Sequence, residues 1–396
     1  MDKPFHLIGI DGGATKVSVW NVNINDNNNV ELSDQSSTLS YSETDGYISD
    51  FSPIIIQTQL TEMNSSIHLT DHELQQGDVI VRTCATAIAR IAKKLSEKPL
   101  LIGMGFPGLK SSDGRGIVAL ANGPRIPDFA ESLENKLSEL GINLFQPISR
   151  LGSDADYCGI GEEYASIGQF KDVQNAYYLG GGTGAADALK LKGKLVPFDN
   201  IKPWLTKSWE LMNQLGNSVE RYASAGGIQW VYSNHYTSIS VEELNNKGLY
   251  PNRLLEMATQ GDPAAIDTFD DVSTNLAMLF FERITTIYTG WLDLFEFVNP
   301  NRDIPSLEHP FRQTLLDRII IGQRLGDLID QSKSSHILWK QIVNNLTHMI
   351  MTYEGLPSKF VHYYCPDGQL NEKIFSTSQL REAPVLGAAM DAYLNI

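Results

Sequence analysis

The sequence predicts an α/β protein with two duplicated halves, and three observations support this prediction. The chain has 396 residues, which exceeds one typical domain of roughly 100 to 200 residues. The stretch "LIGIDGGATKVSVW" at 7–20 joins two apolar strands through a glycine turn, and "YYLGGGTGAADALKL" at 177–191 does the same in the second half. We therefore expect an N-terminal domain of 1–148 plus 381–396 and a C-terminal domain of 149–380 with helical additions.

The elements of the first half follow from local patterns. β-branched residues between turn residues predict strands, and apolar residues repeated every three or four positions predict helices. The polar segment 22–78 contains only short apolar runs and is expected to hold a third strand and surface excursions. The other elements expected here are strands at 5–10, 16–22, 100–108 and 145–151 and helices at 80–97 and 128–140.

The second half repeats this order and adds helices. Its glycine turn lies between two strands, and the second strand ends in a basic hairpin tip at Lys192 to Lys194. The stretch "RIIIGQRLGDLID" at 318–330 is typical of a short buried strand whose glycine turn opens a helix. Helices are expected at 206–214, 217–232, 251–258, 262–298 and 382–394.

Composition and charge argue against several classes of protein. Lys and Arg total 31 against 47 Asp and Glu, a formal charge of −16, whereas a nucleic-acid surface needs clustered cations. The apolar stretch 274–299 is interrupted by four charged residues, so we expect a buried helix and not a membrane span. The start has no secretory pattern, and the three cysteines form no CxxC. We expect a cytoplasmic protein with no nucleic-acid or membrane partner.

The first glycine turn has the residues of a phosphate-binding loop. Gly12 and Gly13 are expected to adopt positive φ and to let a ligand approach the backbone. Asp11 ends a buried strand, where a carboxylate can hold a hydrated divalent cation such as Mg²⁺. Thr15 adds a hydroxyl and Lys16 a positive charge. Because the Walker A pattern and a GxGxxG that opens a helix are both absent, an ordinary β-hairpin stays the alternative.

The second turn repeats this chemistry with Gly182, Thr183 and Gly184 at its centre. Two glycine-threonine hairpins that face each other across a cleft can clamp a triphosphate from both sides. We expect such a clamp here.

This arrangement resembles the superfamily of sugar kinases, heat-shock protein 70 and actin, and within it the sequence resembles the ROK family of repressors and kinases. Similar to family motifs are "GIDGGATK", "GGGTG", "GMGFPGLKSSDGRGIVALANGP", "SDADYCGIGEE", "VERYASAGG", "IIIGQRLG" and "APVLGAAM", spread over most of the chain. The resemblance implies a duplicated ribonuclease H-like (actin-like ATPase) fold with an interdomain cleft. It also implies ATP and Mg²⁺ as cofactors, a sugar as substrate, and a homodimer as a plausible assembly.

Asp154 is the candidate general base, because phosphoryl transfer to a hydroxyl needs a carboxylate that accepts its proton. It follows an apolar strand where a helix begins, so a helix N-cap is the alternative. The resemblance implies that Asp154 and Glu220 also bind sugar hydroxyls, together with Asn122 and the neighbouring Gly123 of "ANGP". A turn residue is the alternative for Asn122, and a surface position on a helix is the alternative for Glu220.

Two departures from the family limit the resemblance. The family's E-x-G-H segment and its zinc-binding histidine and cysteines have no counterpart, so no structural zinc is expected. Glu210 is the acid best placed to replace the missing glutamate, and Asp199 is the second choice. Ser153 stands where the family has asparagine and is expected to leave one sugar hydroxyl to a water.

Gly322 and Arg324 form the candidate adenosine loop. The glycine would let the backbone approach the nucleoside, and the guanidinium would stack on the base. A helix-capping turn with a surface arginine is an equal alternative at this point.

Three other functions compete with an ATP-dependent sugar kinase. "GGGTGAA" also resembles the signature of tubulin-like GTPases, but there a helix follows, whereas "DALKLKGKLV" alternates like a strand; a comparison of GTP and ATP binding separates the two. A sugar-binding repressor would carry a helix-turn-helix ahead of Asp11, where the residues are too few. A kinase that has lost turnover is the third alternative, because the E-x-G-H segment is missing.

Overall fold

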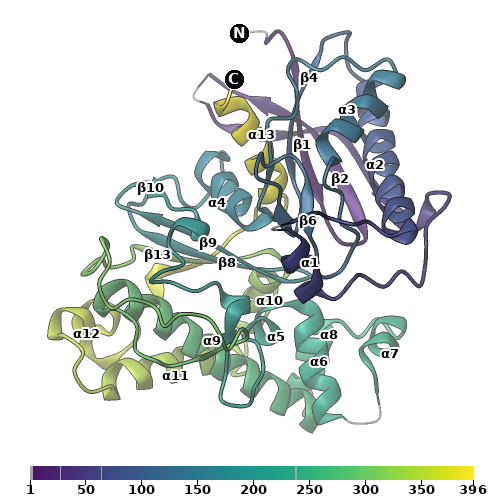
Figure 1. Cartoon of the computed structure of the whole chain (residues 1–396). Coiled ribbons are helices and arrows are strands. Elements are labelled where there is room, and N and C mark those ends of the chain that lie inside the picture. Colours follow the sequence, from purple (N-terminus) through teal and green to yellow (C-terminus); the bar gives the residue numbers. More distant parts are fainter. Residues whose placement is uncertain (1–2, 27, 64, 237–238) are drawn as a thin grey trace. The chain divides into compact units, whose positions relative to one another are not determined.

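A computed structural model describes residues 3–26, 28–63, 65–236 and 239–396, apart from the side chain of Asp154 (Figure 1). The chain forms two compact units, Met1–Gly168 with Glu382–Ile396 and Gln169–Arg381. The segment 149–168, which was predicted to belong to the second domain, lies in the first unit. The reason is that it carries a strand and a helix that pair and pack with elements of that unit.

The first unit is built on a five-stranded sheet in the order β3-β2-β1-β4-β7. The antiparallel pairs β1–β2 and β2–β3 form a meander, and β1, β4 and β7 run parallel. The expected third strand within 22–78 is therefore present. The strand bounds are β1 His6–Gly12, β2 Lys16–Ile24, β3 Val30–Ser40, β4 Leu100–Gly105 and β7 Leu151–Gly152.

Helices cover both faces of this sheet. Ile8 and Ile10 share a core with residues of α2, whereas Gly9 between them points to the other face and meets α13. A Cβ on Gly9 or on its cross-strand partner Gly103 would lie 2.3 or 1.8 Å from a backbone oxygen of α13, so both glycines allow a close approach. The helices are α1 Ile56–Met63, α2 Asp71–Ala92, α3 Phe129–Glu139, α4 Asp154–Tyr164 and α13 Ala383–Leu394.

The second unit repeats the topology with the order β10-β9-β8-β13-β14. Its first three strands again form an antiparallel meander, and β8, β13 and β14 run parallel. This repetition confirms the duplicated α/β fold. The strand bounds are β8 Ala176–Gly181, β9 Ala185–Leu191, β10 Lys194–Leu195, β13 Arg318–Gly322 and β14 Phe375–Thr377.

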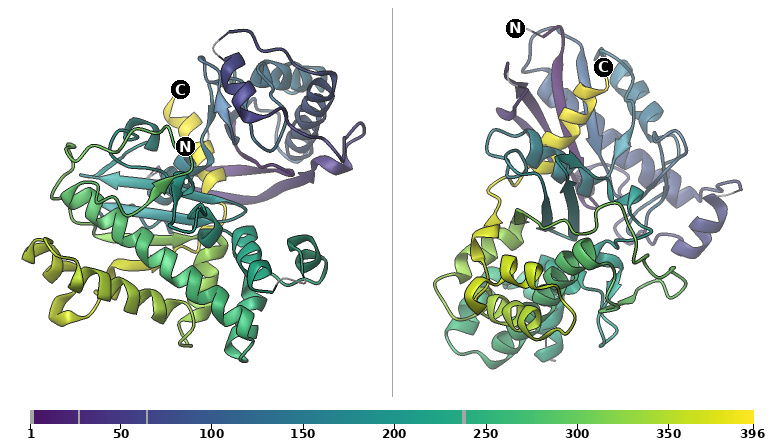
Figure 2. Two further views of the ribbon diagram at one scale, coloured as in Figure 1. Left: turned by 60° about the horizontal axis from the view of Figure 1, so that its bottom comes forward. Right: turned by 90° about the vertical axis from the view of Figure 1, so that its left-hand side faces the viewer.

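A layer of helices packs on this second sheet (Figures 1 and 2). The long helix α9 lies beside α6, α8 and α11, and its buried residues share one core with β8 and β13. This helix accounts for most of the apolar stretch 274–299, as expected. The helix bounds are α5 Glu220–Ala223, α6 Ala225–His235, α7 Val241–Asn246, α8 Pro251–Thr259, α9 Pro263–Thr289, α10 Gln323–Ser332, α11 Trp339–Thr352 and α12 Ser358–Tyr364.

Three of the helices predicted in the second half were wrong in type or length. The expected helix at 206–214 is a 3-10 turn, η3 Ser208–Glu210, followed by the short strand β11 Leu211–Met212. The expected helix at 217–232 is interrupted at Ser224, which is extended and caps α6 through a hydrogen bond from Gly227 N to its Oγ. The expected helix at 262–298 ends at Thr289, and Glu296–Phe297 form β12, which pairs with β11.

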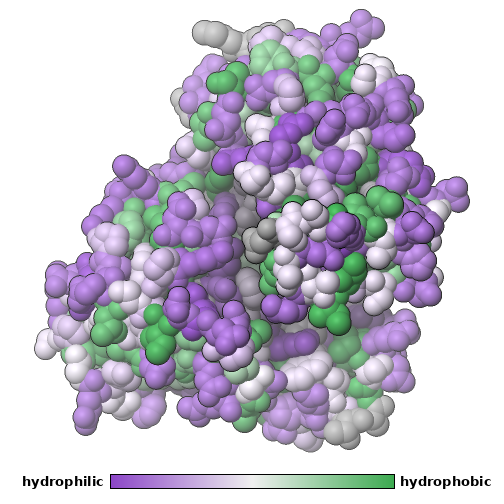
Figure 3. All heavy atoms as spheres, viewed as in Figure 1, coloured by the Kyte–Doolittle hydropathy of each residue, from purple (hydrophilic) through white to green (hydrophobic). Residues whose placement is uncertain are grey.

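The described surface is mainly hydrophilic, and the cysteines are buried. Figure 3 shows a face on which hydrophilic side chains predominate and apolar ones form small groups. Cys84, Cys158 and Cys365 are all buried. Within the described residues, no helix combines the length and the apolar character that crossing a membrane requires.

Candidate functional site

The first glycine turn joins β1 to β2 and is held by backbone hydrogen bonds. Gly13 N donates to Lys16 O at 2.9 Å, and Tyr41 N donates to Thr15 O at 3.0 Å. Thr15 and Lys16 are exposed, and Asp11 is half-buried at the end of β1. The turn thus presents a hydroxyl, an ammonium group and a carboxylate along one short edge.

The glycines of this turn do not have the predicted backbone conformation. Neither Gly12 nor Gly13 has positive φ. Gly12 instead makes room for an aromatic ring, since a Cβ there would lie 2.2 Å from Cδ2 of Phe106. Phe106 is buried and packs on Phe129 with ring centroids 5.3 Å apart. The first turn is therefore fastened to the core of its unit.

Strand register brings the candidate magnesium ligand and the candidate base to one edge of the sheet. Asp11 pairs with Gly105 of β4, and Gly105 pairs with Gly152 of β7. All three strands are parallel, and ligands bind outside the carboxyl ends of such strands. Asp154 opens α4 directly beyond this row, and the residue at the N-cap is Ser153. Asp154 is therefore not the N-cap; its carboxylate lies outside the described part.

A lysine that sequence reasoning missed braces the turn after β4. Lys110 Nζ donates to Phe106 O at 2.6 Å and to Gly108 O at 2.7 Å. Gly108 has φ of 91°, so this Pro-Gly turn does need a glycine. In the motif "FPGLK" the only indication that a lysine braces the turn is a cation three residues beyond the proline.

The loop that carries Asn122 is tied to α1 by a buried glutamine. Leu120 N donates to Oε1 of Gln59 at 2.8 Å, and Nε2 of Gln59 donates to Leu120 O at 3.2 Å. Asn122 is exposed, whereas Gly123 is buried against Leu120, whose Cδ2 lies 2.7 Å from the position of a glycine Cβ. The side chain of Asn122 is thus presented to solvent by a fixed backbone.

Arg125 fastens the other end of this loop. Its buried guanidinium donates to Glu73 Oε1 at 2.7 Å, to His68 O at 3.0 Å and to Glu62. The hydrogen bond from Arg125 lowers the pKa of Glu62. Burial works to raise the pKa of Glu73, but the bonds from Arg125 and Thr70 leave it lowered. The guanidinium is therefore paired on both sides, which a buried charge requires.

The second glycine turn is held by side chains from later in the chain. Gly182 N donates to Gly184 O at 2.9 Å, and Ala185 N donates to Oε1 of Glu220 at 3.0 Å. A Cβ on Gly184 would lie 2.7 Å from that same oxygen of Glu220. Glu220 is half-buried at the start of α5, so it is not a free surface position. Thr183 is exposed at the tip.

The candidate adenosine loop lies at the same edge as this turn, because Gly322 pairs with Gly180 across β13 and β8. Gly322 has φ of −122° at the N-cap of α10, and a Cβ there would lie 2.3 Å from the hydroxyl oxygen of Tyr178. The left-handed residue is Gln323, with φ of 57°. Its Oε1 lies 2.5 Å from the position of a Cβ on Gly182, so Gly182 makes room for this amide.

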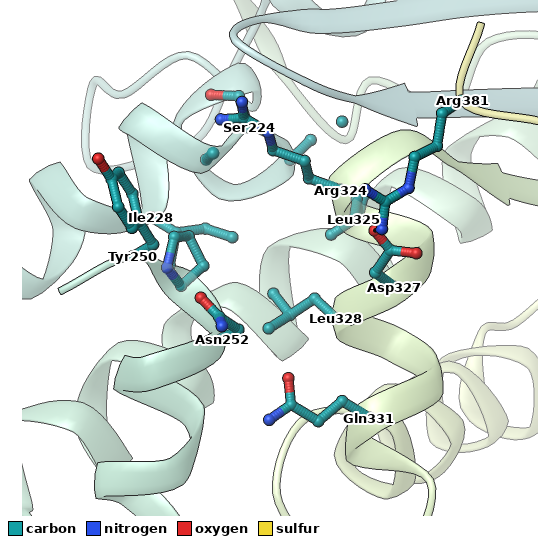
Figure 4. A pocket seen from close by; sticks show the side chains of 14 residues that line it. Ser224, Ile228, Tyr250, Asn252, Arg324, Leu325, Asp327, Leu328, Gln331 and Arg381 are labelled. Carbon is teal, nitrogen blue, oxygen red and sulfur yellow. Dashed lines mark hydrogen bonds and ion pairs between the residues drawn. The ribbon is translucent and has the colours of Figure 1, made fainter. Parts of the chain in front are cut away.

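A pocket of about 490 Å³ opens beside the second turn, within the second unit (Figure 4). Its walls come from the starts of α6 and α8 and from one side of α10. Arg324 reaches across from α10 toward Ser224, and Arg381 pairs with Asp327 at 2.7 Å. Sequence reasoning found Arg324 alone; the other lining residues include Ser224, Ile228, Tyr250, Asn252, Leu328, Gln331 and Arg381.

Glu210 lies on the irregular segment that replaces the predicted helix. Its Oε2 accepts from Lys207 N at 3.2 Å, and its own carbonyl accepts from Val298 N at 2.9 Å. Next to it Trp209 is 44% exposed, whereas Trp204 is buried and stacks on His309. Asp199, the second choice, pairs with Lys202 at 2.7 Å.

The structure therefore gathers the predicted residues into two groups. In the first unit Asp11 lies near the end of β1, Ser153 and the backbone of Asp154 follow β7, and Asn122 lies in the loop after Leu120. In the second unit Arg324 and Gly181, the residue before the turn at 182–184, line one pocket, and Glu220 supports that turn. How the first group meets the second stays a prediction.

The donor set suits Mg²⁺ held partly by water. Asp11 is one half-buried carboxylate at a strand end, and Mg²⁺ usually keeps several waters while one or two carboxylates and substrate phosphates hold it. Among the residues that the structure describes, no group of three or more His, Cys, Asp and Glu side chains could hold a metal ion.

Comparison with known proteins rests on structure alone. No protein-family model matches the chain, and no curated protein matches it. A ROK family glucokinase from Streptomyces griseus, in complex with glucose and AMPPNP, is 14% identical with a TM-score of 0.57 over 98% of this chain and 99% of that one. A ROK hexokinase from Thermus thermophilus is 14% identical with a TM-score of 0.54 over 99% of both chains.

A regulator shares the same architecture. The ROK family transcriptional regulator that is a homologue of the E. coli MLC protein is 13% identical with a TM-score of 0.54, over 98% of this chain and 78% of that chain. Kinases and a transcriptional regulator therefore have this fold in common. The chain has the two-unit α/β fold of the ROK sugar kinases.

Proposed function

We propose that the protein is an ATP-dependent kinase that phosphorylates a hydroxyl of a hexose or an amino sugar. The observation that carries the proposal is the row Asp11, Gly105 and Gly152, which brings the first glycine turn and the start of α4 to one sheet edge. A phosphate-binding turn and a candidate base are then neighbours in the same unit.

The nucleotide would bind at the second turn and its pocket. The pocket volume of about 490 Å³ falls within the range of roughly 300 to 1,000 Å³ for small-molecule sites. Apolar Ile228 and Leu328 would pack on the base, while Arg324 would stack on it or pair with a phosphate. Backbone N–H groups of the turn at 182–184 would bind the phosphates.

Asp11 would hold Mg²⁺ through water, with Thr15 and Lys16 beside it at the first turn. Bound Mg²⁺ would neutralise charge on the phosphates during transfer. Asp154 would accept the proton of the attacking hydroxyl.

Four polar side chains are the proposed sugar contacts: Asn122, Ser153, Glu210 and Glu220. Side chains that pair with hydroxyls reject the wrong sugar, because that sugar leaves them buried without a partner. Glu220 already accepts a hydrogen bond from Ala185 N through one carboxylate oxygen. It would therefore link the second glycine turn to the sugar. The three cysteines form no CxxC, which agrees with a reducing compartment such as the cytoplasm.

The test is sugar-dependent ADP release with Mg²⁺-ATP and a panel of hexoses, amino sugars and N-acetylated sugars. Asp154→Asn should lower kcat by about a hundredfold to ten thousandfold, the usual contribution of a general base. The control is Asp71→Asn, because Asp71 is an exposed carboxylate at the same first position of a helix, α2. Unchanged turnover in Asp154→Asn would refute the assignment of the base.

A sugar-binding protein without turnover is the second candidate. The regulator of the same fold and the missing E-x-G-H segment favour it. It predicts that calorimetry detects sugar binding while no sugar in the panel releases ADP.

A further inference from the structure

A buried polar cluster lies beneath the segment that carries Glu210. Its centre is Asp187 of β9, which is 1% exposed. Oδ1 of Asp187 accepts from the hydroxyl of Tyr177 at 2.6 Å and lies 3.3 Å from Nη2 of Arg283. Oδ2 accepts from both the amide and the hydroxyl of Ser208, at 2.8 and 2.7 Å. All four side chains are buried.

The charge of Asp187 is compensated inside the core by α9. Arg283 is fully buried and pairs with Asp187 and with its neighbour Glu282, which also accepts from the hydroxyl of Thr286 at 2.8 Å. Burial opposes the charge of Arg283, but Glu282, Tyr177 and Asp187 raise its pKa. An unpaired buried charge is strongly destabilising, so Asp187 and Arg283 hold each other in place.

Ser208 is the point where this cluster meets the irregular segment. It begins η3, and Glu210 ends that turn two residues later. The backbone bonds of the segment are mostly local: Glu210 N donates to Lys207 O, Val219 N donates to Leu211 O, and β12 and Val298 pair with Leu211–Met212 and Glu210. Both donors of Ser208 converge on one carboxylate oxygen, which fixes the start of η3 in position and in orientation.

We propose that Asp187 is a positioning residue for sugar binding. Through Ser208 it orients η3, so that Glu210 and the exposed ring of Trp209 are presented to the sugar as a rigid pair. Asp187 itself touches no substrate. The sugar part of this inference rests on the proposed function, and the anchoring of the segment stands apart from it.

The position of Asp187 in the chain supports the same conclusion. It lies three residues beyond Gly184, at the start of the strand that leaves the second turn. The nucleotide turn and the segment with Glu210 are therefore held by one short piece of β9. A common support keeps the segment with Glu210 and the second glycine turn in a fixed geometry. Transfer of a phosphoryl group from the nucleotide to the sugar needs such a geometry.

The test compares Ser208→Ala, Asp187→Asn and a control, Ser273→Ala. Ser208→Ala removes only the hydroxyl donor and keeps the amide bond, so it should fold. Ser273 is an equally buried serine in α9 whose hydroxyl donates to Asp270 O. Hydrogen exchange of 204–214 is measured first, because it needs no activity, and sugar and ATP affinities are measured by calorimetry and by KM.

We expect exchange in 204–214 to rise about two- to tenfold in Ser208→Ala, the effect of one lost hydrogen bond, and further in Asp187→Asn. The sugar KM and dissociation constant should rise with it, while the KM of ATP and the values for Ser273→Ala stay unchanged. Unaltered exchange in both variants overturns the proposal, and so does faster exchange with an unaltered sugar affinity. A wild type that binds sugar without releasing ADP refutes the kinase but leaves this test intact.

Discussion

The two glycine turns share sequence and topology but differ in what holds them. The first is closed by backbone bonds and seated on the buried ring of Phe106. The second is also closed by a backbone bond, from Gly182 N to Gly184 O, but polar side chains reach it from later in the chain, Glu220 from α5 and Gln323 from α10. Similar glycine motifs can therefore serve different purposes: one avoids a clash in a core, the other makes room for functional groups.

This difference suggests a division of labour between the halves. A turn fixed to a core is a rigid platform, and a turn supported by a carboxylate and an amide responds when those groups meet a ligand. We expect substitution of Gly12 in the first turn to change mainly stability and substitutions in the second turn to change mainly binding.

The largest effect is expected for Gly12→Ala. The added methyl would lie 2.2 Å from the ring of Phe106, which is 1% exposed and cannot move freely. Overpacking of this kind costs about 1 to 3 kcal/mol of stability. Chemical denaturation should show this loss, together with weaker activity.

Gly13→Ala is the matched control for that variant. A Cβ on Gly13 meets Lys16 O at 3.4 Å, an ordinary contact, and φ is not positive there. Its stability should stay within about 0.5 kcal/mol of the wild type. Equal losses in both variants would show that backbone conformation, and not Phe106, demands the glycines of this turn.

The second prediction concerns Glu220, which supports the second glycine turn from α5. Glu220→Ala leaves Ala185 N without its acceptor and should raise the KM of both ATP and sugar, with a stability loss of about 0.5 to 1.5 kcal/mol. Glu220→Gln keeps an acceptor oxygen and should recover the ATP affinity. Steady-state kinetics with each substrate varied in turn measures the split. If Gln behaves like Ala, the negative charge and not the hydrogen bond is what the turn requires.

A smaller effect is expected for Gly184→Ala. The new methyl would lie 2.7 Å from Oε1 of Glu220, and the end of a half-buried side chain can move aside at little cost. Denaturation should therefore detect less than the loss seen in Gly12→Ala, while nucleotide titration should detect weaker binding. A stability loss as large as that of Gly12→Ala would remove the contrast between the turns.

Much of this fold could be predicted from the sequence, because the strands around the turns are continuous apolar runs. The duplication, the third strand and the helices at 251–258 and 382–394 required only local patterns. The segment 204–218 could not be predicted, since its short apolar periodicity suits a helix. Its conformation is instead set by Asp187, more than a dozen residues upstream, and by the pairing of β11 with β12.

The candidate site was predictable where its residues follow strands and not where partners are distant. Asp11, Ser153 and Asp154 end or follow parallel strands, so the motifs locate them. Gln59 and Arg125, which hold the loop of Asn122, have partners 52 to 63 residues away in the chain, and a single sequence gives no sign of such pairs. The backbone conformations predicted for Gly12 and Gly13 were also wrong. The sequence shows that a glycine has no side chain, but it does not show which neighbouring residue would clash with one.

The smallest of the expected effects is a loss of stability at acidic pH in the second unit but not in the first. His309 stacks on Trp204 with ring centroids 4.0 Å apart in the second unit. Its Nε2–H donates to Thr286 O at 3.0 Å and its Nδ1 accepts from Phe311 N at 3.3 Å, so the folded protein holds the neutral ring. Burial lowers the pKa of His309, helped by Arg312 and opposed by Thr286 and Glu308.

A lowered pKa means that protonation favours the unfolded chain. The stability contribution of His309 is thus complete above the ordinary histidine pKa, about 6.5, and is lost as pH falls through the lower folded value. Hydrogen exchange between pH 7 and 5 should show helix α9 around Thr286 opening more readily, with β1 and β4 of the first unit unaffected by this group. His309→Gln keeps a donor and an acceptor without the titration, so its α9 should lose that part of the pH dependence. A wild type and a variant with identical pH profiles would show that the ring does not report on the second unit, and the stacking on Trp204 would then be packing alone.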